Sequence, residues 1–417
     1  RALDLHAHDA VRYVGGMLAW MHQALASELE FLEAIFGENT EEGQNSRSSS
    51  GKHRKSTPIA AADTEQSKDT AVMEDNVEGN LSAAAATVSK QVGLSIPQLL
   101  ACCLQGLGRP LRVRIMQTLE TKSSLDILYS LTDLLSFYQE TFHRITPIEN
   151  AVHSAVKGCL NECKRMFLSA LNKQGQSLLQ SPVTYPLDLK ASVVTRECAV
   201  QVKEILRVCS TALSVVSCDV ADSCHIDAVL GGIIQPLLQS CRLGGQALQP
   251  AEMAIFMLNN VSVLQHEISE ASKRSKQTYK SSSWLTLLNT EATTWIDILV
   301  REEVARALRR SDMDKLLELI EVLPSDLRAV DQLGLSNDRV GTVVRAFYAS
   351  LFSTVTSQFE RLQDPTLRET MRSGISEQIA AAHAKVHEFV SKESNGYDTS
   401  ILSHTVQEVR VLLGCEN

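Results

Sequence analysis

The stretch DAVRYVGGMLAWMHQALASELEFLEAIF, residues Asp9 to Phe36, decides the fold class of this chain. Its apolar residues recur every three or four positions, which is the spacing of a helix with a buried seam. The seam comprises Val11, Val14, Leu18, Met21, Leu25, Leu29, Leu32 and Phe36. A second apolar line beside it comprises Tyr13, Met17, Trp20, Ala24, Phe31 and Ile35. A helix that is apolar over so wide an arc predicts packing against more than one partner helix.

The same spacing recurs along the rest of the chain, most regularly in one later seam. That seam comprises Leu128, Leu131, Leu135, Tyr138, Phe142 and Ile145. Glycine and proline are expected to interrupt two further helices, one between Gly106 and Pro110 and one between Gly231 and Pro236. We find no strand or hairpin pattern and no repeat of fixed period. The sequence therefore predicts an all-α fold, an elongated stack of antiparallel helix bundles.

Composition suggests two regions in the chain. A helical bundle is predicted for residues 1–180, with an insertion at about 38–80 that is rich in Ser, Glu, Thr, Asn and Gly. Such a segment buries too little apolar surface to offset the entropy of ordering it, so we expect it to be disordered. The run SPVTYP at 181–186 predicts a stiff connector. C-terminal helical bundles are expected for residues 187–417, with a further division near 311–335.

The overall composition excludes several classes of function. The chain has 417 residues, is 44% hydrophobic and carries a formal net charge of -9. A negative chain is not expected to bind nucleic acid or to dock its whole surface on anionic lipid. No apolar run approaches the roughly 18 residues that would span a bilayer. Ten cysteines are too few for a secreted disulfide scaffold of this length, so we expect reduced thiols and a cytosolic protein.

Cysteine and histidine spacing gives one weak candidate for a metal site. Cys218, Cys224 and His225 flank a predicted turn, but their spacing matches no CxxC zinc pattern. Cys159 and Cys163 are one helical turn apart and could supply two ligands. Both fall on an apolar stripe, which favours buried core cysteines. The sequence thus predicts no bound metal and no cofactor, with a zinc protein using Cys218, Cys224 and His225 as a remote alternative.

Other chemical motifs are incomplete. His383 and His387 have the spacing of a zinc-binding HExxH helix, but Ala384 stands where the motif requires glutamate. His6 and His8 precede a helix start and are expected to be a polar lead-in. We find no phosphate-binding loop and no nucleophile elbow. The sequence therefore predicts no catalytic residue.

Arg109, Arg112 and Arg114 form the densest basic patch outside the segment 38–80. They could bind phosphate or an acidic partner. The competing interpretation is a solvated helix face, with the arginine stems lying over apolar surface.

Several blocks of the chain resemble one known family. The first is RALDLHAHDAVRYVGGMLAWMHQALASE, residues Arg1 to Glu28. GRPLRVRIMQTLE at Gly108–Glu120, LYSLTDLLSFYQETF at Leu128–Phe142 and IQPLLQSCRLGGQALQPAEMAIFMLNN at Ile234–Asn260 follow in the same order. Together they resemble the C-terminal part of the sixth subunit of the conserved oligomeric Golgi (COG) complex, a family of helical-rod tethers.

This resemblance implies a non-catalytic subunit of a Golgi vesicle-tethering complex that supports intra-Golgi retrograde transport. The implied partners are sibling subunits of the complex, SNAREs and Rab GTPases, and the implied location is the cytosolic face of the Golgi membrane. The resemblance implies no cofactor and no transmembrane segment. The alternative hypothesis is a helical adaptor, or a subunit of another tether such as exocyst.

Overall fold

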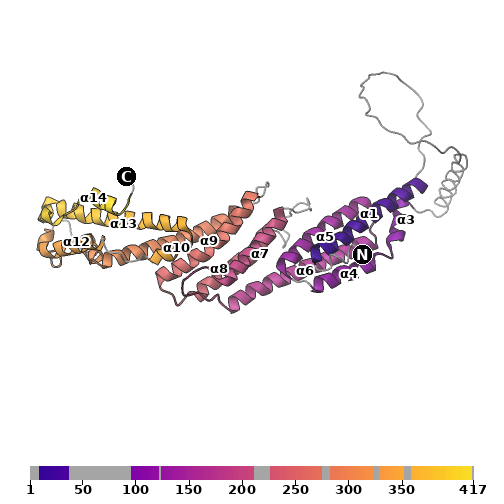
Figure 1. Cartoon of the computed structure of the whole chain (residues 1–417), viewed down its shortest axis with the longest axis horizontal. Coiled ribbons are helices and arrows are strands. Elements are labelled where there is room, and N and C mark those ends of the chain that lie inside the picture. Colours follow the sequence, from indigo (N-terminus) through magenta and orange to yellow (C-terminus); the bar gives the residue numbers. More distant parts are fainter. Residues whose placement is uncertain are drawn as a thin grey trace, which may run out of the picture. The chain divides into compact units, whose positions relative to one another are not determined.

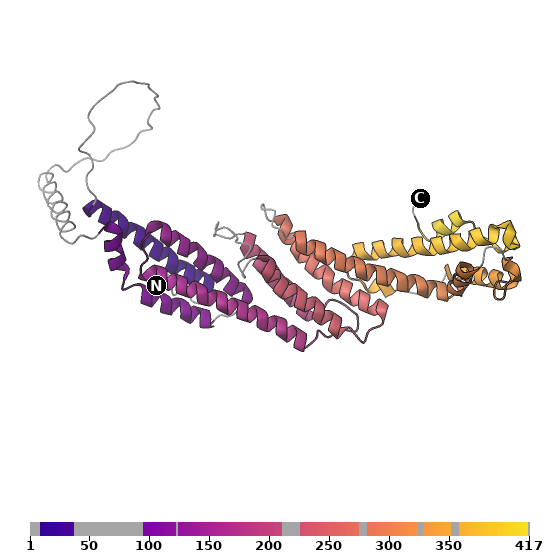
Figure 2. The same ribbon diagram turned by 180° about the vertical axis from the view of Figure 1, so that it is seen from behind.

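The computed structural model describes most of the chain in two compact units (Figures 1 and 2). The described residues are 9–36, 95–121, 124–210, 226–274, 282–323, 328–351 and 358–415. Within these ranges the chain forms helices and no β-strand, as predicted. The first unit holds the described residues up to Phe167 and the second those from Leu168 onward. The predicted limits 1–180 and 187–417 stay a prediction, and the segment 38–80 lies outside the described residues.

The first unit is a helical bundle. It contains α1 (Ala10–Phe36), α3 (Ile96–Leu104), α4 (Gly108–Thr121), α5 (Leu125–Ile145) and the N-terminal part of α6 (Ala151–Gln180). Helix α1 packs against α3, α4 and α5, so the prediction of several partner helices is confirmed. Its buried seam comprises Ala10, Val14, Leu18, Met21, Leu25 and Leu32.

The second apolar line of α1 is only partly buried. The side chains of Trp20 and Phe31 are 57% and 58% exposed. The expectation that this whole arc would be covered was therefore wrong for these two residues. Helical spacing shows which residues share a face, but it does not show whether a neighbouring helix extends far enough to cover them.

The interruption predicted between Gly106 and Pro110 is confirmed. Helix α3 ends at Leu104 and α4 begins at Gly108. Glycine at 108 serves a second purpose, because a Cβ atom there would lie 2.4 Å from the carbonyl oxygen of Ala151 at the start of α6. The two helix starts can approach each other this closely only when the side chain is a hydrogen atom.

The second unit is also made of packed helices. It contains α7 (Val193–Ser210), α8 (Ile226–Gly244), α9 (Pro250–Arg274), α10 (Ser282–Arg309), α11 (Met313–Val322), α12 (Asn337–Leu351), α13 (Pro365–Ser391) and α14 (Val406–Leu412). Helix α9 packs along α10 and against α7, and α13 contacts α10 and α14. The helices α9 and α10 run side by side in both views (Figures 1 and 2).

Helix α8 corrects one expectation from the sequence. It was predicted to break between Gly231 and Pro236, but it runs without interruption from Ile226 to Gly244. Gly232 faces α6, where a built Cβ would lie 2.8 Å from the side chain of Leu171, whereas a Cβ at Gly231 would lie 3.2 Å from the ring of Trp284 on α10. Close packing of α8 against α6 at this point offsets the loss of the backbone hydrogen bond that Pro236 cannot donate.

Two consecutive asparagines tie the start of α7 to α9. The Asn259 amide donates to the carbonyl of Leu189 at 2.8 Å, and its oxygen accepts the backbone N–H of Gln363 at 2.7 Å. The oxygen of Asn260 accepts the hydroxyl of Thr195 at 2.5 Å. Both asparagines are fully buried, so these bonds satisfy groups that would otherwise be costly inside the core.

Candidate functional site

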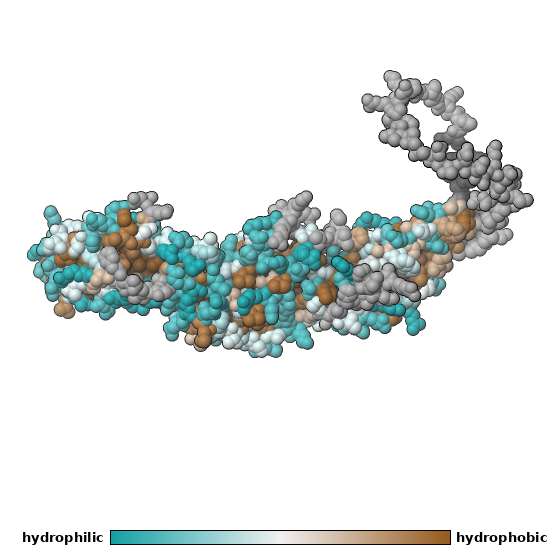
Figure 3. All heavy atoms as spheres, viewed as in Figure 1, coloured by the Kyte–Doolittle hydropathy of each residue, from teal (hydrophilic) through white to brown (hydrophobic). Residues whose placement is uncertain are grey.

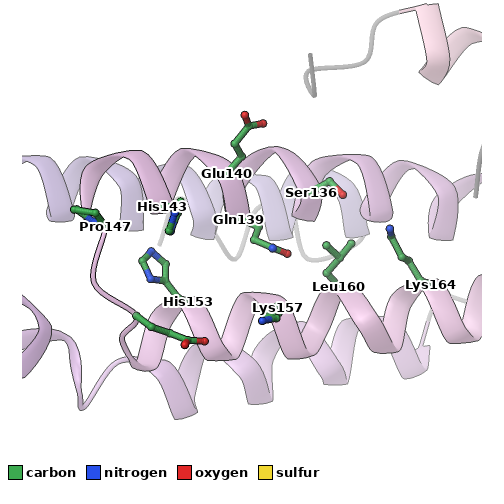
Figure 4. A pocket seen from close by; sticks show the side chains of 10 residues that line it. Ser136, Gln139, Glu140, His143, Pro147, His153, Lys157, Leu160 and Lys164 are labelled. Atoms are coloured by element: carbon green, nitrogen blue, oxygen red, sulfur yellow. The ribbon is translucent and has the colours of Figure 1, made fainter. Parts of the chain in front are cut away.

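A groove of about 740 Å³ lies between α5 and α6 of the first unit (Figure 4). Gln139 projects from α5 toward α6, whereas Glu140 points away from α6. The lining comprises Ser136, Gln139, Glu140, His143, Pro147, Glu149, His153, Lys157, Leu160 and Lys164. None of these side chains was predicted from the sequence to form a site, because they belong to no motif.

One end of the groove is fixed by hydrogen bonds at the corner between α5 and α6. The oxygen of Asn150 accepts the backbone N–H groups of Val152 at 3.0 Å and His153 at 3.1 Å, which caps α6. The Asn150 amide donates to the Thr146 hydroxyl at 3.2 Å, and that hydroxyl lies 3.1 Å from His153 Nε2. His153 is therefore held as part of the corner, with its ring 5.9 Å from that of His143.

The chemistry of the groove is that of a binding surface. It offers two imidazoles, two lysines, two carboxylates and an amide, with Ser136 as the one hydroxyl in the lining. The oxygen Oε1 of Gln139 is buried and has no hydrogen-bond partner among the described residues. The described lining contains no thiol, and the Nε2 of the buried His153 contacts the corner threonine. This arrangement suits polar contacts with a partner better than nucleophilic catalysis.

The paired cysteines of α6 lie in the core, as the sequence predicts. Cys159 and Cys163 are fully buried, and the Cys163 sulfur lies 3.4 Å from the Thr132 hydroxyl. Burial raises the pKa of Cys159 to about 11, so this thiol stays protonated at neutral pH. Among the residues that the structure describes, no three metal-ligating side chains are grouped together.

Two further groups of candidate metal ligands are not described by the structure. Cys218, Cys224 and His225 lie outside the described residues, as do His6 and His8.

His383 and His387 lie one turn apart on α13, with their ring centroids 5.9 Å apart and His387 half-buried. The His383 ring is fully buried and stacks on Phe347, with centroids 5.6 Å apart and planes at 9°. Its Nε2 lies 3.1 Å from the hydroxyl of Tyr348. His387 instead lies with its Nδ1 3.4 Å from the hydroxyl of Ser391. No pattern in the sequence marks the contact between His383 and Tyr348, because the two residues are on different helices.

The arginines of α4 are exposed. Arg109, Arg112 and Arg114 all lie on the solvent side, and Arg114 donates to the hydroxyl of Tyr13 at 3.4 Å. On the face drawn in Figure 3, apolar residues are scattered among polar ones.

Comparison with known proteins identifies the family. The profile described as Conserved Oligomeric Golgi complex subunit 6, C-terminal, matches residues 1–413. The chain belongs to this family. The match covers both units, and the family is that of a subunit of a complex.

Curated relatives agree with the family over almost the whole chain. The conserved oligomeric Golgi complex subunit 6 of Arabidopsis thaliana is 22% identical over 99% of this chain and 61% of its own length. The proteins of the same name from Bos taurus and Homo sapiens are 25% and 24% identical, each over 99% of this chain and 55% of its own length. The chain thus spans little more than half the length of these relatives.

Solved structures show the same kind of fold. Exo70 of S. cerevisiae matches with a TM-score of 0.53 at 12% identity, over 82% of this chain and 71% of its own. A second structure of this exocyst component matches with the same TM-score at 11% identity, over 97% and 73%. The all-α fold predicted from the sequence is therefore confirmed. No described helix is both long enough and apolar enough to cross a bilayer.

Proposed function

We propose that this chain is the C-terminal, non-catalytic part of a subunit of the Golgi vesicle-tethering complex. It supports intra-Golgi retrograde transport by binding sibling subunits, SNAREs and Rab GTPases. It acts at the cytosolic face of the Golgi membrane without a membrane-spanning segment of its own. The proposal assigns no catalytic residue, no cofactor and no metal.

The family match across residues 1–413 is the observation that carries this proposal. The helical fold is consistent with it, because helices rise about 1.5 Å per residue and packed helices resist bending. The groove between α5 and α6 supports a binding role, since most of its lining side chains carry polar groups and its buried histidine is used to build the helix corner.

Cell-based transport measures the proposed role directly. The full-length protein would be fused to a fluorescent tag, and its position compared with a Golgi marker. Depletion of the protein should slow the return of a resident enzyme between Golgi cisternae, and re-expression should restore the rate. Normal retrograde transport after complete depletion would contradict the proposal.

The alternative of an exocyst subunit or other helical adaptor does not gain from the likeness to Exo70. At 11–12% identity that likeness concerns the fold alone.

The zinc alternative has a separate test, elemental analysis of the purified chain. We expect less than stoichiometric zinc, and a Cys218→Ser/Cys224→Ser variant that keeps the same content. One zinc per chain, lost in that variant, would revive the zinc protein.

A further inference from the structure

Helix α4 carries a concentrated positive charge on its exposed face. Arg109, Arg112 and Arg114 lie within its first two turns and are all exposed. At 100° per residue, Arg112 and Arg114 fall on opposite flanks of that face, with Arg109 between them. Val113 also lies between the flanks, and its apolar side chain is 45% exposed. The face thus combines an apolar centre with cations on both sides.

These three arginines differ from the other described arginines of the first unit. Arg12 pairs with Asp9, Arg144 with Glu140 and Arg165 with Glu162, each within one turn of its own helix. Arg109, Arg112 and Arg114 form no ion pair with any described residue. The one acid on the described part of α3 and α4 is Glu120, which lies at the other end of α4.

The hydrogen bond of Arg114 does not neutralise it. Its partner is the phenol of Tyr13 on α1, 3.4 Å away. Tyrosine is uncharged at neutral pH, so the contact orients the guanidinium and leaves its charge uncompensated. Arginine is also the side chain best suited to pairing with carboxylates, because its planar fork can donate two parallel hydrogen bonds.

We propose that the exposed face of α4 is a docking surface for an acidic helical segment of a partner protein. Carboxylates on both flanks of that segment pair with Arg109, Arg112 and Arg114, while an apolar residue between them covers Val113. Helix-in-groove and helix-on-helix recognition combine an apolar anchor with flanking charges in this way.

Charge counting favours a protein partner over a membrane. Recognition of anionic lipid by a basic cluster takes about four to eight lysines or arginines. Helix α4 has three, on a chain whose formal net charge is -9. A negatively charged lipid surface would repel the rest of such a chain, whereas a single acidic helix meets only the local patch.

The test uses the whole chain and a synthetic helical peptide as the probe. The peptide has a leucine stripe flanked by glutamates, carries a fluorescent label and is titrated by fluorescence anisotropy at low and high salt. We expect saturable binding that weakens as salt rises. The R109E/R112E variant should bind at least about tenfold more weakly, and the milder R109Q/R112Q variant should show an intermediate loss.

A matched control separates local contact from overall charge. The R144E/R165E variant changes the net charge by the same amount on α5 and α6, and should keep binding within about twofold of the unchanged chain at high salt. A peptide with glutamines in place of glutamates should not bind. Circular dichroism of each variant checks that it is folded.

Three results would overturn the proposal. One is the absence of binding by the glutamate peptide, and another is an equal loss in both charge-reversal variants. The third is tighter binding to vesicles containing 30% phosphatidylserine than to the peptide, abolished in R109E/R112E. That third outcome would assign the arginines of α4 to a membrane surface instead.

Discussion

The hydroxyl of Tyr348 lies 3.1 Å from Nε2 of His383, although the two residues are 35 positions apart. The same hydroxyl donates to the backbone carbonyl of His404 at 3.3 Å. Because its single hydrogen goes to that carbonyl, Nε2 of His383 must carry the proton that reaches the tyrosine oxygen. The other nitrogen, Nδ1, is buried without a partner among the described residues. A neutral histidine thus joins α12, α13 and the segment before α14.

Acidification should destabilise the second unit through His383. Burial, with the nearby His387 and His404, lowers the pKa of His383 from 6.5 to about 4. The unfolded chain takes up this proton near pH 6.5, whereas the folded chain does so only near pH 4. The contribution of neutral His383 to the free energy of unfolding is therefore complete above pH 6.5. It is lost as the pH falls toward 4, and the loss amounts to at most about 3 kcal/mol. Thermal unfolding followed by circular dichroism across this range measures the loss.

The control for this prediction is His383→Phe, which can still stack on Phe347 but cannot titrate. Its stability should change less between pH 6.5 and 4.5 than that of the unchanged chain, in which carboxylates also titrate at the lower end. Tyr348→Phe keeps the histidine and removes the hydroxyl, so its pH dependence should persist. Identical slopes for the unchanged chain and His383→Phe would rule out His383 as the cause.

Gly108→Ala should destabilise the first unit by about 1–3 kcal/mol. The added Cβ would lie 2.4 Å from the carbonyl oxygen of Ala151, which is backbone and cannot rotate away. Gly106→Ala is the matched control, because nothing lies within 4 Å of a Cβ built there. Chemical denaturation of both variants gives the comparison, and equal stabilities would show that α4 and α6 do not approach as described.

Asn259→Ala should cost the second unit about 2–4 kcal/mol, measured by the same denaturation experiment. The change leaves the carbonyl of Leu189 and the N–H of Gln363 without their 2.8 Å and 2.7 Å partners. Asn289→Ala removes an exposed amide whose side chain contacts Gln265 at 2.7 Å, and should change stability by less than about 0.5 kcal/mol. A loss at Asn259 no larger than at Asn289 would mean that the buried network adds little.

Local pattern accounts for most of the helices but not for the contacts between them. The spacing of Leu18, Met21 and Leu25 was enough to place the buried seam of α1. The stretch from Gly231 to Pro236 was expected to interrupt a helix, yet α8 continues, and Gly232 lets α6 pack closely beside it. The exposure of Trp20 likewise depends on neighbouring elements. In each case the packing between helices, and not local helix propensity, decides the outcome.

The candidate site was largely beyond prediction from the sequence. The groove between α5 and α6 depends on the spacing of two helices, and no motif marks Gln139 or Lys157. Binding surfaces of helical proteins are made of ordinary exposed side chains, so residue type alone does not distinguish them. The arginines of α4 were visible as a basic patch, but the absence of ion pairs to described residues became clear only in the structure.

Affinity purification with quantitative mass spectrometry tests the proposed membership of the Golgi complex most directly. The full-length protein would carry a tag at its natural expression level, and its partners would be compared with those of a tagged exocyst subunit. We predict that the other subunits of the Golgi complex co-purify in near-equal amounts and that exocyst subunits do not. Enrichment of exocyst subunits, or of no Golgi-complex subunit, would contradict the account.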